Sequence, residues 1–148
     1  MSKVFKLGIT NLNNKNIKEV DTIKVLANKG IVGDRHFDEF NDPYCQLTLI
    51  ESENIDQYNI KYGLNISYID FRRNIIISNF KICEMIGQKI KINDVILKIH
   101  EVCQPCNYLQ KKLNSPNLVK KLVNKSGVRA EILSSGYINI GSKIRKIK

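Results

Sequence analysis

The sequence contains no tryptophan, only two histidines, and no apolar run close to the ~20 residues that a membrane-spanning helix needs. We therefore expect no membrane span. The first residues, Met1–Leu7, show neither the apolar core nor the cleavage site of a signal peptide, which favours a cytoplasmic location. With 148 residues, of which 43% are hydrophobic and 26% charged, the chain is long enough for one globular domain over residues 1–148.

Acidic side chains are scarce, because 14 Asp and Glu face 24 Lys and Arg and leave a formal net charge of +10. Most of the basic residues are lysines, which we interpret mainly as a compositional bias of solvated faces. The few arginines lie near glycine, asparagine or histidine and are better candidates for binding an anion. A basic field attracts phosphate-bearing ligands and nucleic acid alike, so charge predicts the sign of a partner and not its identity.

Cysteine occurs four times, and Cys103 and Cys106 form a C-x-x-C pair. In the cytoplasm we expect thiols rather than a disulfide framework. A zinc site needs two further ligands at regular spacing, and the sequence has no second C-x-x-C and no H-x-x-x-H. A thioredoxin-type motif needs a β-α-β context, whereas this pair lies late in a mostly β chain. A metal or redox C-x-x-C module is therefore an alternative to a single reactive thiol. Cys45 and Cys83 adjoin apolar residues, and we expect both to be buried and inert.

The cysteine pair follows the apolar run Val95–Val102, and Asn107–Leu113 behind it predict a short helix. A cysteine near a helix N-terminus is favoured as the thiolate by the unpaired N–H groups and the macrodipole. The thiolate is both the nucleophile and the ligand for soft metals. We therefore expect a depressed pKa for the thiol of Cys106 and a lower reactivity for Cys103.

Strand-like segments rich in Ile and Val dominate the chain, and several alternate apolar with polar residues. The arms on both sides of Asn93-Asp94 alternate in this way, which predicts a hairpin with a tight turn. Gly136 and Gly141 are the turn points of a second such segment. The expected strands are Val4–Ile9, Val20–Leu26, Gln46–Ile50, Asn74–Ser78, Lys89–Ile92, Val95–Val102, Val128–Leu133 and Lys143–Ile147.

Helices are few by comparison. The segment Ser52–Tyr62 predicts one, which begins at Glu51 or Ser52 and ends at Gly63. Another begins at Ser115 and has an apolar stripe behind it. Many short strands with two or three short helical insertions predict a mainly-β fold, a β-barrel, since a doubly wound sheet would need helices alternating with strands.

Two loops collect side chains that can bind an anion. The loop Lys29–Phe37 is framed by glycines and carries Asp34, whose carboxylate could orient the side chain of Arg35 or His36. The second loop ends in three consecutive polar residues before a buried-looking strand, which are Arg72, Arg73 and Asn74. Arginine forks suit phosphate and other oxyanions. A surface turn and a charged strand edge are the structural alternatives for these two loops.

Taken in order, these segments resemble the MOSC domain, the module named for the C-terminal part of molybdenum cofactor sulfurase. The resemblance follows the free-standing bacterial form and extends over nearly the whole chain. It implies a β-barrel that binds the molybdenum cofactor or handles sulfur bound for a metal centre. The segments that carry it are Gly30–His36, Gln46–Ser52, Arg72–Ile75, Leu97–Cys106, Gly127–Leu133 and Gly136–Gly141.

The resemblance also implies site residues. The family's characteristic cysteine follows a proline, which makes Cys106 the catalytic thiol and the metal ligand. The cofactor-binding positions are Arg35, His36, Arg72, Arg73, Asn74 and Arg129. In this interpretation three arginines hold the phosphate of the pterin, namely Arg72, Arg73 and Arg129, while Arg35 and His36 lie on the opposite rim.

Full-length sulfurases carry a pyridoxal-phosphate desulfurase domain, and we expect no pyridoxal phosphate in this chain. A separate cysteine desulfurase or a molybdoenzyme would then be the protein partner, and an anionic molybdopterin the ligand. Cys103 could resolve a persulfide on Cys106 or pack as a small hydrophobe. The alternative function is a basic β-barrel that binds single-stranded nucleic acid. The net charge favours that alternative, whereas the lack of tryptophan and of clustered tyrosines does not.

Overall fold

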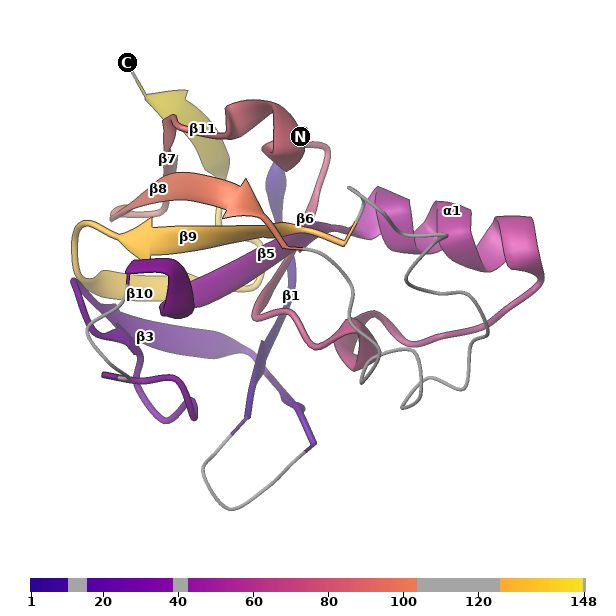
Figure 1. Ribbon diagram of the computed structural model, residues 1–148, viewed down its shortest axis with the longest axis horizontal. Helices are drawn as coiled ribbons and strands as arrows, with labels where there is room; N and C mark the ends of the chain where they lie inside the picture. Colours follow the sequence, from indigo (N-terminus) through magenta and orange to yellow (C-terminus); the bar gives the residue numbers. More distant parts are fainter. Residues whose placement is uncertain (11–15, 39–42, 104–125, 148) are drawn as a thin grey trace.

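The structure, a computed structural model, describes residues 1–10, 16–38, 43–103 and 126–147. In this part of the chain it contains strands β1 to β11, the helix α1 and three short 3-10 helices (Figure 1). The expected mainly-β fold is confirmed. The strands form two sheets whose inner faces share one apolar core.

Eight strands form the larger sheet, in the order β11-β7-β8-β9-β5-β6-β1-β2. Neighbours are antiparallel except β5 and β6, which run parallel. The bounds are β1 Lys3–Ile9, β2 Lys18–Val20, β5 Leu47–Glu51, β6 Ile75–Ser78, β7 Lys89–Ile92, β8 Val95–Val102, β9 Val128–Ile132 and β11 Ile144–Ile147.

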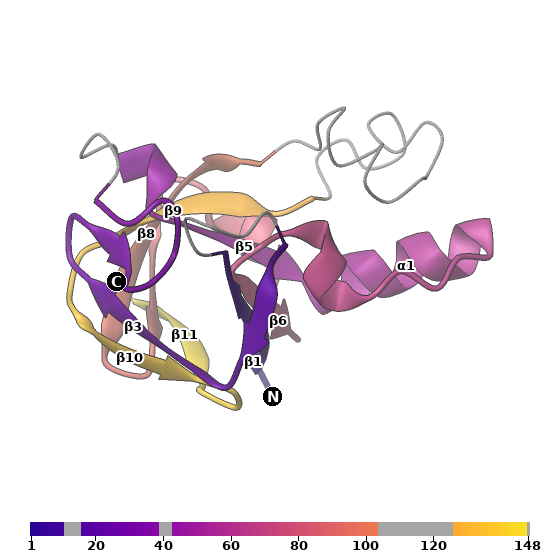
Figure 2. The ribbon, with the colours of Figure 1, turned by 90° about the horizontal axis from the view of Figure 1, so that it is seen from below.

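The larger sheet curls until β1 meets the segment that precedes β11. A backbone bridge joins Lys3 to Lys143, and the N–H of Val4 donates to the carbonyl of Ser142 at 2.9 Å. The carbonyl of Val4 accepts from the N–H of Gly141 at 2.8 Å. These bonds join the segment before the end strand β11 to β1, the strand next to the other end, and Figure 2 looks into the barrel that results.

The smaller sheet consists of β10 (Gly136–Asn139), β3 (Thr22–Leu26) and β4 (Gly30–Ile31). The sequence predicted one strand over Val20–Leu26; a strand over Thr22–Leu26 is confirmed, but Val20 belongs to β2 because the chain bends at Asp21. The residues before the bend pair with β1 in the larger sheet, and those after it pair with β10. Asp21 and Thr22 interrupt the apolar alternation, but this break alone does not show that the chain changes sheets.

The core follows from the alternation of side chains along each strand. In β8, Val95, Leu97 and Ile99 are fully buried, whereas Ile96 and Lys98 between them are half-buried. Each buried aliphatic side chain of this kind contributes about 1.5–3 kcal/mol to folding. The polar residues between the core positions therefore lie on the outer face of the barrel, where a binding site can form.

The helix α1 (Ser52–Tyr62) packs on the outside of the barrel and projects away from it (Figure 1). A second apolar cluster holds it there, made of Ile50, Ile55, Tyr58, Phe71 and Ile76. The helix has the expected bounds, and Gly63 ends it in the left-handed conformation with φ 63°. Among the residues that the structure describes, no helix is long and apolar enough to cross a membrane.

Several short elements were not expected. They are the 3-10 helices η1 (Pro43–Cys45), η2 (Tyr68–Phe71) and η3 (Ile82–Met85), together with β4. The hairpin between β7 and β8 is confirmed, with Asn93 in its turn at φ 54°. The helices expected over Asn107–Leu113 and from Ser115 lie outside the described residues.

Candidate functional site

Asn74 lies just before β6, and its side chain connects β6 to two neighbouring strands. Its carboxamide oxygen accepts from the N–H and from the hydroxyl of Thr48 in β5, at 3.1 and 3.2 Å. Its amide group donates to the carbonyl of Gly8 in β1 at 3.1 Å. These three bonds fix the carboxamide, so Asn74 sets the position of β1 and β5 relative to β6.

The glycine-framed loop is fixed to the end of β1 through Asp34. This carboxylate is only 6% exposed, and it accepts from the N–H of Thr10 at 2.9 Å and from the N–H of His36 at 3.2 Å. We expected it to orient the side chain of Arg35 or His36, but it holds main-chain groups. The Nε of Arg35 donates instead to the ring Nε2 of His36 at 3.2 Å.

These contacts bring together the two loops that the sequence analysis singled out, the glycine-framed loop and the loop that ends at Asn74. Gly8 and Thr10 are two residues apart at the end of β1, and each is bonded to one of the loops. The N–H of Arg35 also donates to the carbonyl of Thr10 at 2.5 Å. The fold therefore gathers Arg35, His36 and Asn74, which are far apart in sequence, around one strand end.

Arg72 and Arg73 take different roles although they are adjacent. Arg72 is half-buried and adopts a left-handed conformation, φ 63°, where it ends η2. Arg73 is 9% exposed, and its Nε donates to the carbonyl of Ser126 at 2.7 Å. A buried guanidinium that bonds a main-chain carbonyl anchors that segment. Arg72 is thus the more accessible of the two for a ligand.

Hydrogen bonds at Cys103 join the end of β8 to the start of β9. The N–H of Cys103 donates to the carbonyl of Gly127 at 2.7 Å, and its carbonyl accepts from the hydroxyl of Ser126. The side chain of Cys103 is 2% exposed. This burial favours a packing role for Cys103 over that of a second reactive thiol.

Arg129 lies on the outer face of β9, directly opposite Thr48 of β5. Its Nε is 3.6 Å from a carboxylate oxygen of Glu101, and one terminal nitrogen donates to the carbonyl of Tyr44 at 3.4 Å. Because Thr48 bonds Asn74, the side chains of Arg129 and Asn74 share one stretch of the outer face. The sequence pattern could not predict this proximity, because it depends on the register of β9 against β5.

Sequence reasoning missed a polar pair on the same face, His100 and Glu131. The register of β8 against β9 shifts between Ile99 and Glu101, which is a β-bulge at His100. The Nε2 of His100 lies 2.8 Å from Oε1 of Glu131, and its ring centroid lies 4.7 Å from that of Tyr44. A carboxylate that holds one ring nitrogen orients the imidazole for proton transfer at the other. Alternation places both residues outward, but only the strand register shows that they meet.

The remaining thiols differ in how far the structure describes them. Cys83 is half-buried rather than fully buried; burial raises the pKa of its thiol, and the charge of Glu51 raises it further. A raised pKa favours the inert thiol, as we expected for Cys83. The side chain of Cys45 and the whole of Cys106 lie outside the described residues. In the described part of the chain, no three or more His, Cys, Asp or Glu side chains are grouped to hold a metal ion.

The burial of the Glu51 carboxylate leads to a prediction about the stability of the fold. Glu51 is 6% exposed, and burial raises the pKa of its carboxyl above 4.5, although Lys81 and the N–H of Cys83 oppose the rise. A raised pKa in the folded state means that stability is lost as the pH rises through that pKa. Glu51→Gln should therefore stabilise the protein at pH 7.5 by on the order of 1 kcal/mol, because an isosteric amide replaces a desolvated charge.

Urea unfolding of wild type and Glu51→Gln at pH 7.5 and pH 4 measures this gain. We expect the gain to shrink at pH 4, where the carboxyl is mostly protonated in both states of the wild type. The exposed neighbour Glu84 provides the control, since Glu84→Gln removes the same charge without relieving burial. An equal gain at both pH values would contradict this account of Glu51.

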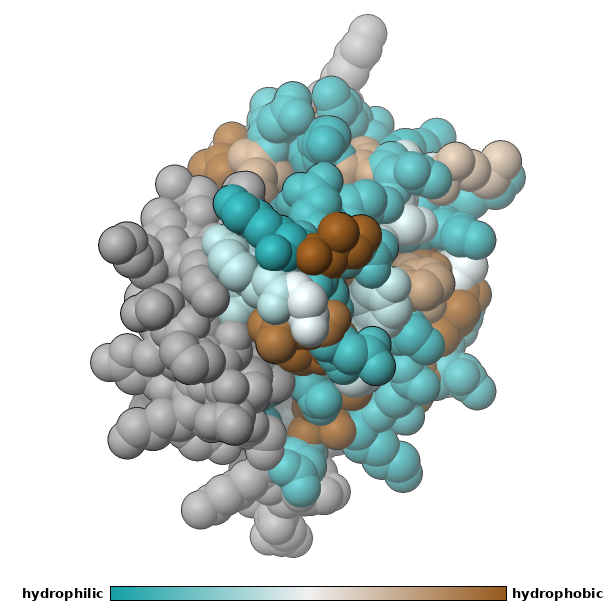
Figure 3. Space-filling model, turned by 90° about the vertical axis from the view of Figure 1, so that its right-hand side faces the viewer, coloured by the Kyte–Doolittle hydropathy of each residue, from teal (hydrophilic) through white to brown (hydrophobic). Residues whose placement is uncertain are grey.

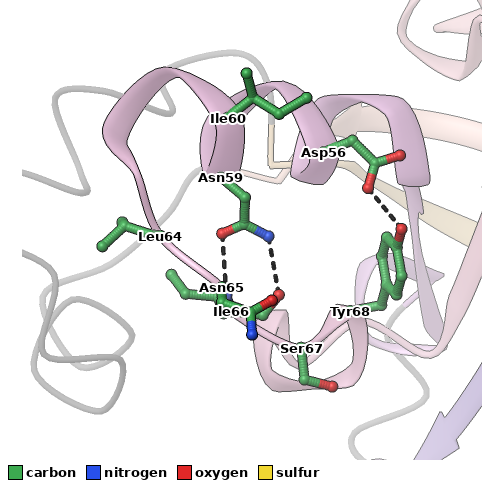
Figure 4. A pocket seen from close by; sticks show the side chains of 8 residues that line it. All are labelled: Asp56, Asn59, Ile60, Leu64, Asn65, Ile66, Ser67 and Tyr68. Atoms are coloured by element: carbon green, nitrogen blue, oxygen red, sulfur yellow. Dashed lines mark hydrogen bonds between the residues drawn. The ribbon is translucent and has the colours of Figure 1, made fainter.

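An open pocket of about 610 Å³ lies between the second half of α1 and the segment that follows it (Figure 4). The carboxamide of Asn59 bonds both the N–H and the carbonyl of Ile66 at 3.0 Å, and the hydroxyl of Tyr68 donates to Asp56 at 2.5 Å. In Figure 3, which faces this end of the molecule, hydrophobic side chains are scattered among hydrophilic ones. These polar groups make hydrogen bonds to one another. We therefore interpret the residues around the pocket as a structural support for α1.

Comparison with known families identifies the chain as a MOSC protein. The model of the MOSC domain matches residues 33–145, and the chain therefore belongs to this family. The matched range contains all the site residues that the resemblance implied. The family is linked to molybdenum cofactor sulfurase-like function. Comparison of the sequence with curated proteins finds no match.

Solved structures with low sequence identity share the fold. The YuaD protein from Bacillus subtilis matches with a TM-score of 0.82 and 18% identity, over 97% of this chain and 94% of that one. YiiM from Geobacillus stearothermophilus matches with a TM-score of 0.79 and 15% identity, over 100% of this chain and 76% of that one. YiiM from Escherichia coli gives 0.74 and 13%, over 99% and 70%. At these identities the likeness concerns the fold alone.

Proposed function

We propose that the protein binds the molybdenum cofactor in the cytoplasm, and that Cys106 coordinates the molybdenum or carries sulfur to it. Membership of the MOSC family supports this proposal. The main structural support is that the two anion-binding loops lie together at the end of β1. Asp34 and Asn74 hold the loops there through hydrogen bonds to the main chain of β1 and the residue that follows it. Basic side chains from separate parts of the chain thereby border one surface, which suits an anionic pterin.

The phosphate of the pterin would contact the accessible basic side chains Arg35, Arg72 and Arg129. Arg129 already faces Glu101, but the two side chains are 40% and 52% exposed and 3.6 Å apart. Exposed ion pairs of this kind are worth little, so a phosphate can replace the carboxylate. Arg73 and Asn74 bond main-chain groups, and in this proposal they hold the loops in position.

Cys106 would act at the same surface. Three residues span at most about 11 Å, so the chain tethers Cys106 within that distance of Cys103 at the end of β8. The neighbouring strand β9 carries Arg129. A thiolate is a soft ligand that suits a metal already held by the sulfur atoms of the pterin. When bound, the cofactor would supply the molybdenum, and the protein would supply the thiolate and the anion-binding side chains.

The sulfur in this proposal comes from another protein. A separate cysteine desulfurase would carry the sulfur as a persulfide on its own cysteine; the Cys106 thiolate would attack the outer sulfur, so that Cys106 becomes the persulfide and the desulfurase cysteine leaves as a thiolate. A molybdoenzyme would receive the finished cofactor. The single-stranded nucleic-acid alternative finds less support. The aromatic rings of Phe5 and Tyr68, of Tyr58 and Tyr62, and of Tyr58 and Phe71 pack against each other at 5.1 to 6.1 Å beneath α1. They are therefore not a stacking platform in a basic groove.

Titration with released molybdenum cofactor, followed by pterin fluorescence under anaerobic conditions, tests the proposal. We expect the double variant Arg35→Ala/Arg72→Ala to bind at least about tenfold more weakly than wild type, because hydrogen bonds to a charged group are worth about 1.5–3 kcal/mol each. Arg145→Ala removes an exposed arginine from β11 and should bind within about twofold of wild type.

Two outcomes would count against the proposal. If the double variant binds as tightly as wild type, these arginines do not hold the phosphate. If the wild type does not bind the cofactor at all, the proposed function itself fails.

A further inference from the structure

A grid of cations covers the outer face of three neighbouring strands, β8, β7 and β11. Lys89 stands directly opposite Lys98, and Lys91 directly opposite Arg145. In each strand, a residue next to the cation is buried in the core. Because side chains alternate along a strand, all four cationic side chains point outward. We call these four residues the basic face.

The arrangement is unfavourable in the isolated protein. Like charges directly opposite each other on neighbouring strands repel and lower stability. Elsewhere the sheet places an acid across from a cation, as in Arg129 with Glu101, whose charged atoms lie 3.6 Å apart. Within the described residues, none of the four cations of the basic face has a carboxylate within ion-pair distance. Glu131 stands opposite Lys98, but its carboxylate is bonded to His100 at 2.8 Å.

Aliphatic side chains interrupt the basic face. Ile96 stands opposite Lys91 and Ile147 opposite Lys89, and both isoleucines are half-buried. Leu133, which is 37% exposed, lies beside Ile96 and donates its N–H to the carbonyl of Ile96 at 2.8 Å. Aliphatic groups neither stack on bases nor bind phosphates, and this grid contains no aromatic ring. The mixture of cations and aliphatic groups fits a protein better than a nucleic acid.

We propose that the basic face is the docking site for an acidic segment of a partner protein that also carries aliphatic side chains. Residues on one face of a strand recur every ~6.6 Å, so acidic side chains at alternate positions of an extended segment match the spacing of Lys89 and Lys91. Its aliphatic side chains would cover Ile96 and Leu133. The surface shares no residue with the proposed cofactor site, and the proposal stands or falls independently of it.

Fluorescence anisotropy with a labelled, glutamate-rich peptide that contains leucines tests the docking. We expect Lys89→Glu/Lys91→Glu to weaken binding at least about tenfold, because two attractions become repulsions. The control Lys18→Glu/Lys61→Glu makes the same change in net charge at exposed lysines outside the basic face and should stay within about threefold of wild type. A peptide with serine in place of leucine should bind more weakly to the wild type.

The same variants give a second measurement, which tests the repulsion between the paired cations. Lys89→Glu/Lys91→Glu turns two like-charge pairs into opposite-charge pairs, so its Tm should rise by about 2–4 °C while binding is lost. The control variant should show no such rise. The proposal is overturned if the face variant binds the peptide like wild type. It is also overturned if duplex DNA, or vesicles of anionic lipid, compete for the face more strongly than the peptide does.

Discussion

Replacing Gly127 with alanine is expected to lower the free energy of unfolding by about 4 kcal/mol, a large part of the stability of a domain of this size. Gly127 has φ +102°, which side chains rarely adopt, and a Cβ at this position would lie 2.1 Å from the carbonyl oxygen of Leu49. That oxygen belongs to the backbone of β5 and cannot swing away. Relief of the clash requires β9 to move off β5, which breaks the ladder between Val128 and Leu49.

A variant at Gly141 separates the two causes of this loss of stability, which are the backbone strain and the steric clash. Gly141 also has a positive φ, +88°, but a Cβ there would meet nothing within 4 Å. Gly141→Ala should therefore lose only the backbone strain, about 1 kcal/mol. Chemical denaturation of both variants measures the difference. If Gly127→Ala costs no more than Gly141→Ala, the close approach of β9 to β5 is not as the structure describes.

Features that depend on neighbouring residues were predictable from the sequence. The bounds of α1 follow from its apolar spacing and from Gly63, and the hairpin follows from the Asn93-Asp94 turn. Features that depend on which strands pair were not predictable. The strand expected over Val20–Leu26 begins at Thr22 instead, because Val20 pairs with β1 in the larger sheet and Thr22–Val25 pair with β10 in the smaller one. Asp21 is a poor strand former and marks the division, but only the tertiary pairing shows that the strands on its two sides join different sheets.

The candidate site shows the same contrast between local features, which were predictable, and tertiary contacts, which were not. The motifs pointed to Arg35, His36, Arg73 and Asn74, but not to what their side chains do. Arg73 and Asn74 look like ligand-binding residues in the sequence, and the structure shows both bonded to main-chain carbonyls of distant segments. The contact of His100 with Glu131 joins residues 31 positions apart and depends on the register of two strands. Sequence spacing contains no information on that register.

Replacing Cys106 with serine is expected to remove most of the bound molybdenum while leaving the fold intact. Serine is nearly the same size but is a hard, neutral ligand, whereas a thiolate is charged and soft. The matched control is Cys83→Ser, because burial and Glu51 raise the pKa of the Cys83 thiol and make it a poor ligand. Thermal unfolding of all three proteins checks that neither substitution disrupts folding.

In the proposed function this chain binds the molybdenum cofactor, and Cys106 coordinates the molybdenum. The most direct test is to purify the wild type, Cys106→Ser and Cys83→Ser from a host that makes the cofactor, and to measure molybdenum and pterin per protein. We expect the wild type and Cys83→Ser to retain both, and Cys106→Ser to retain at least about tenfold less molybdenum, a loss of about 1.4 kcal/mol or more in binding. Equal molybdenum in the wild type and Cys106→Ser, or none in either, would contradict it.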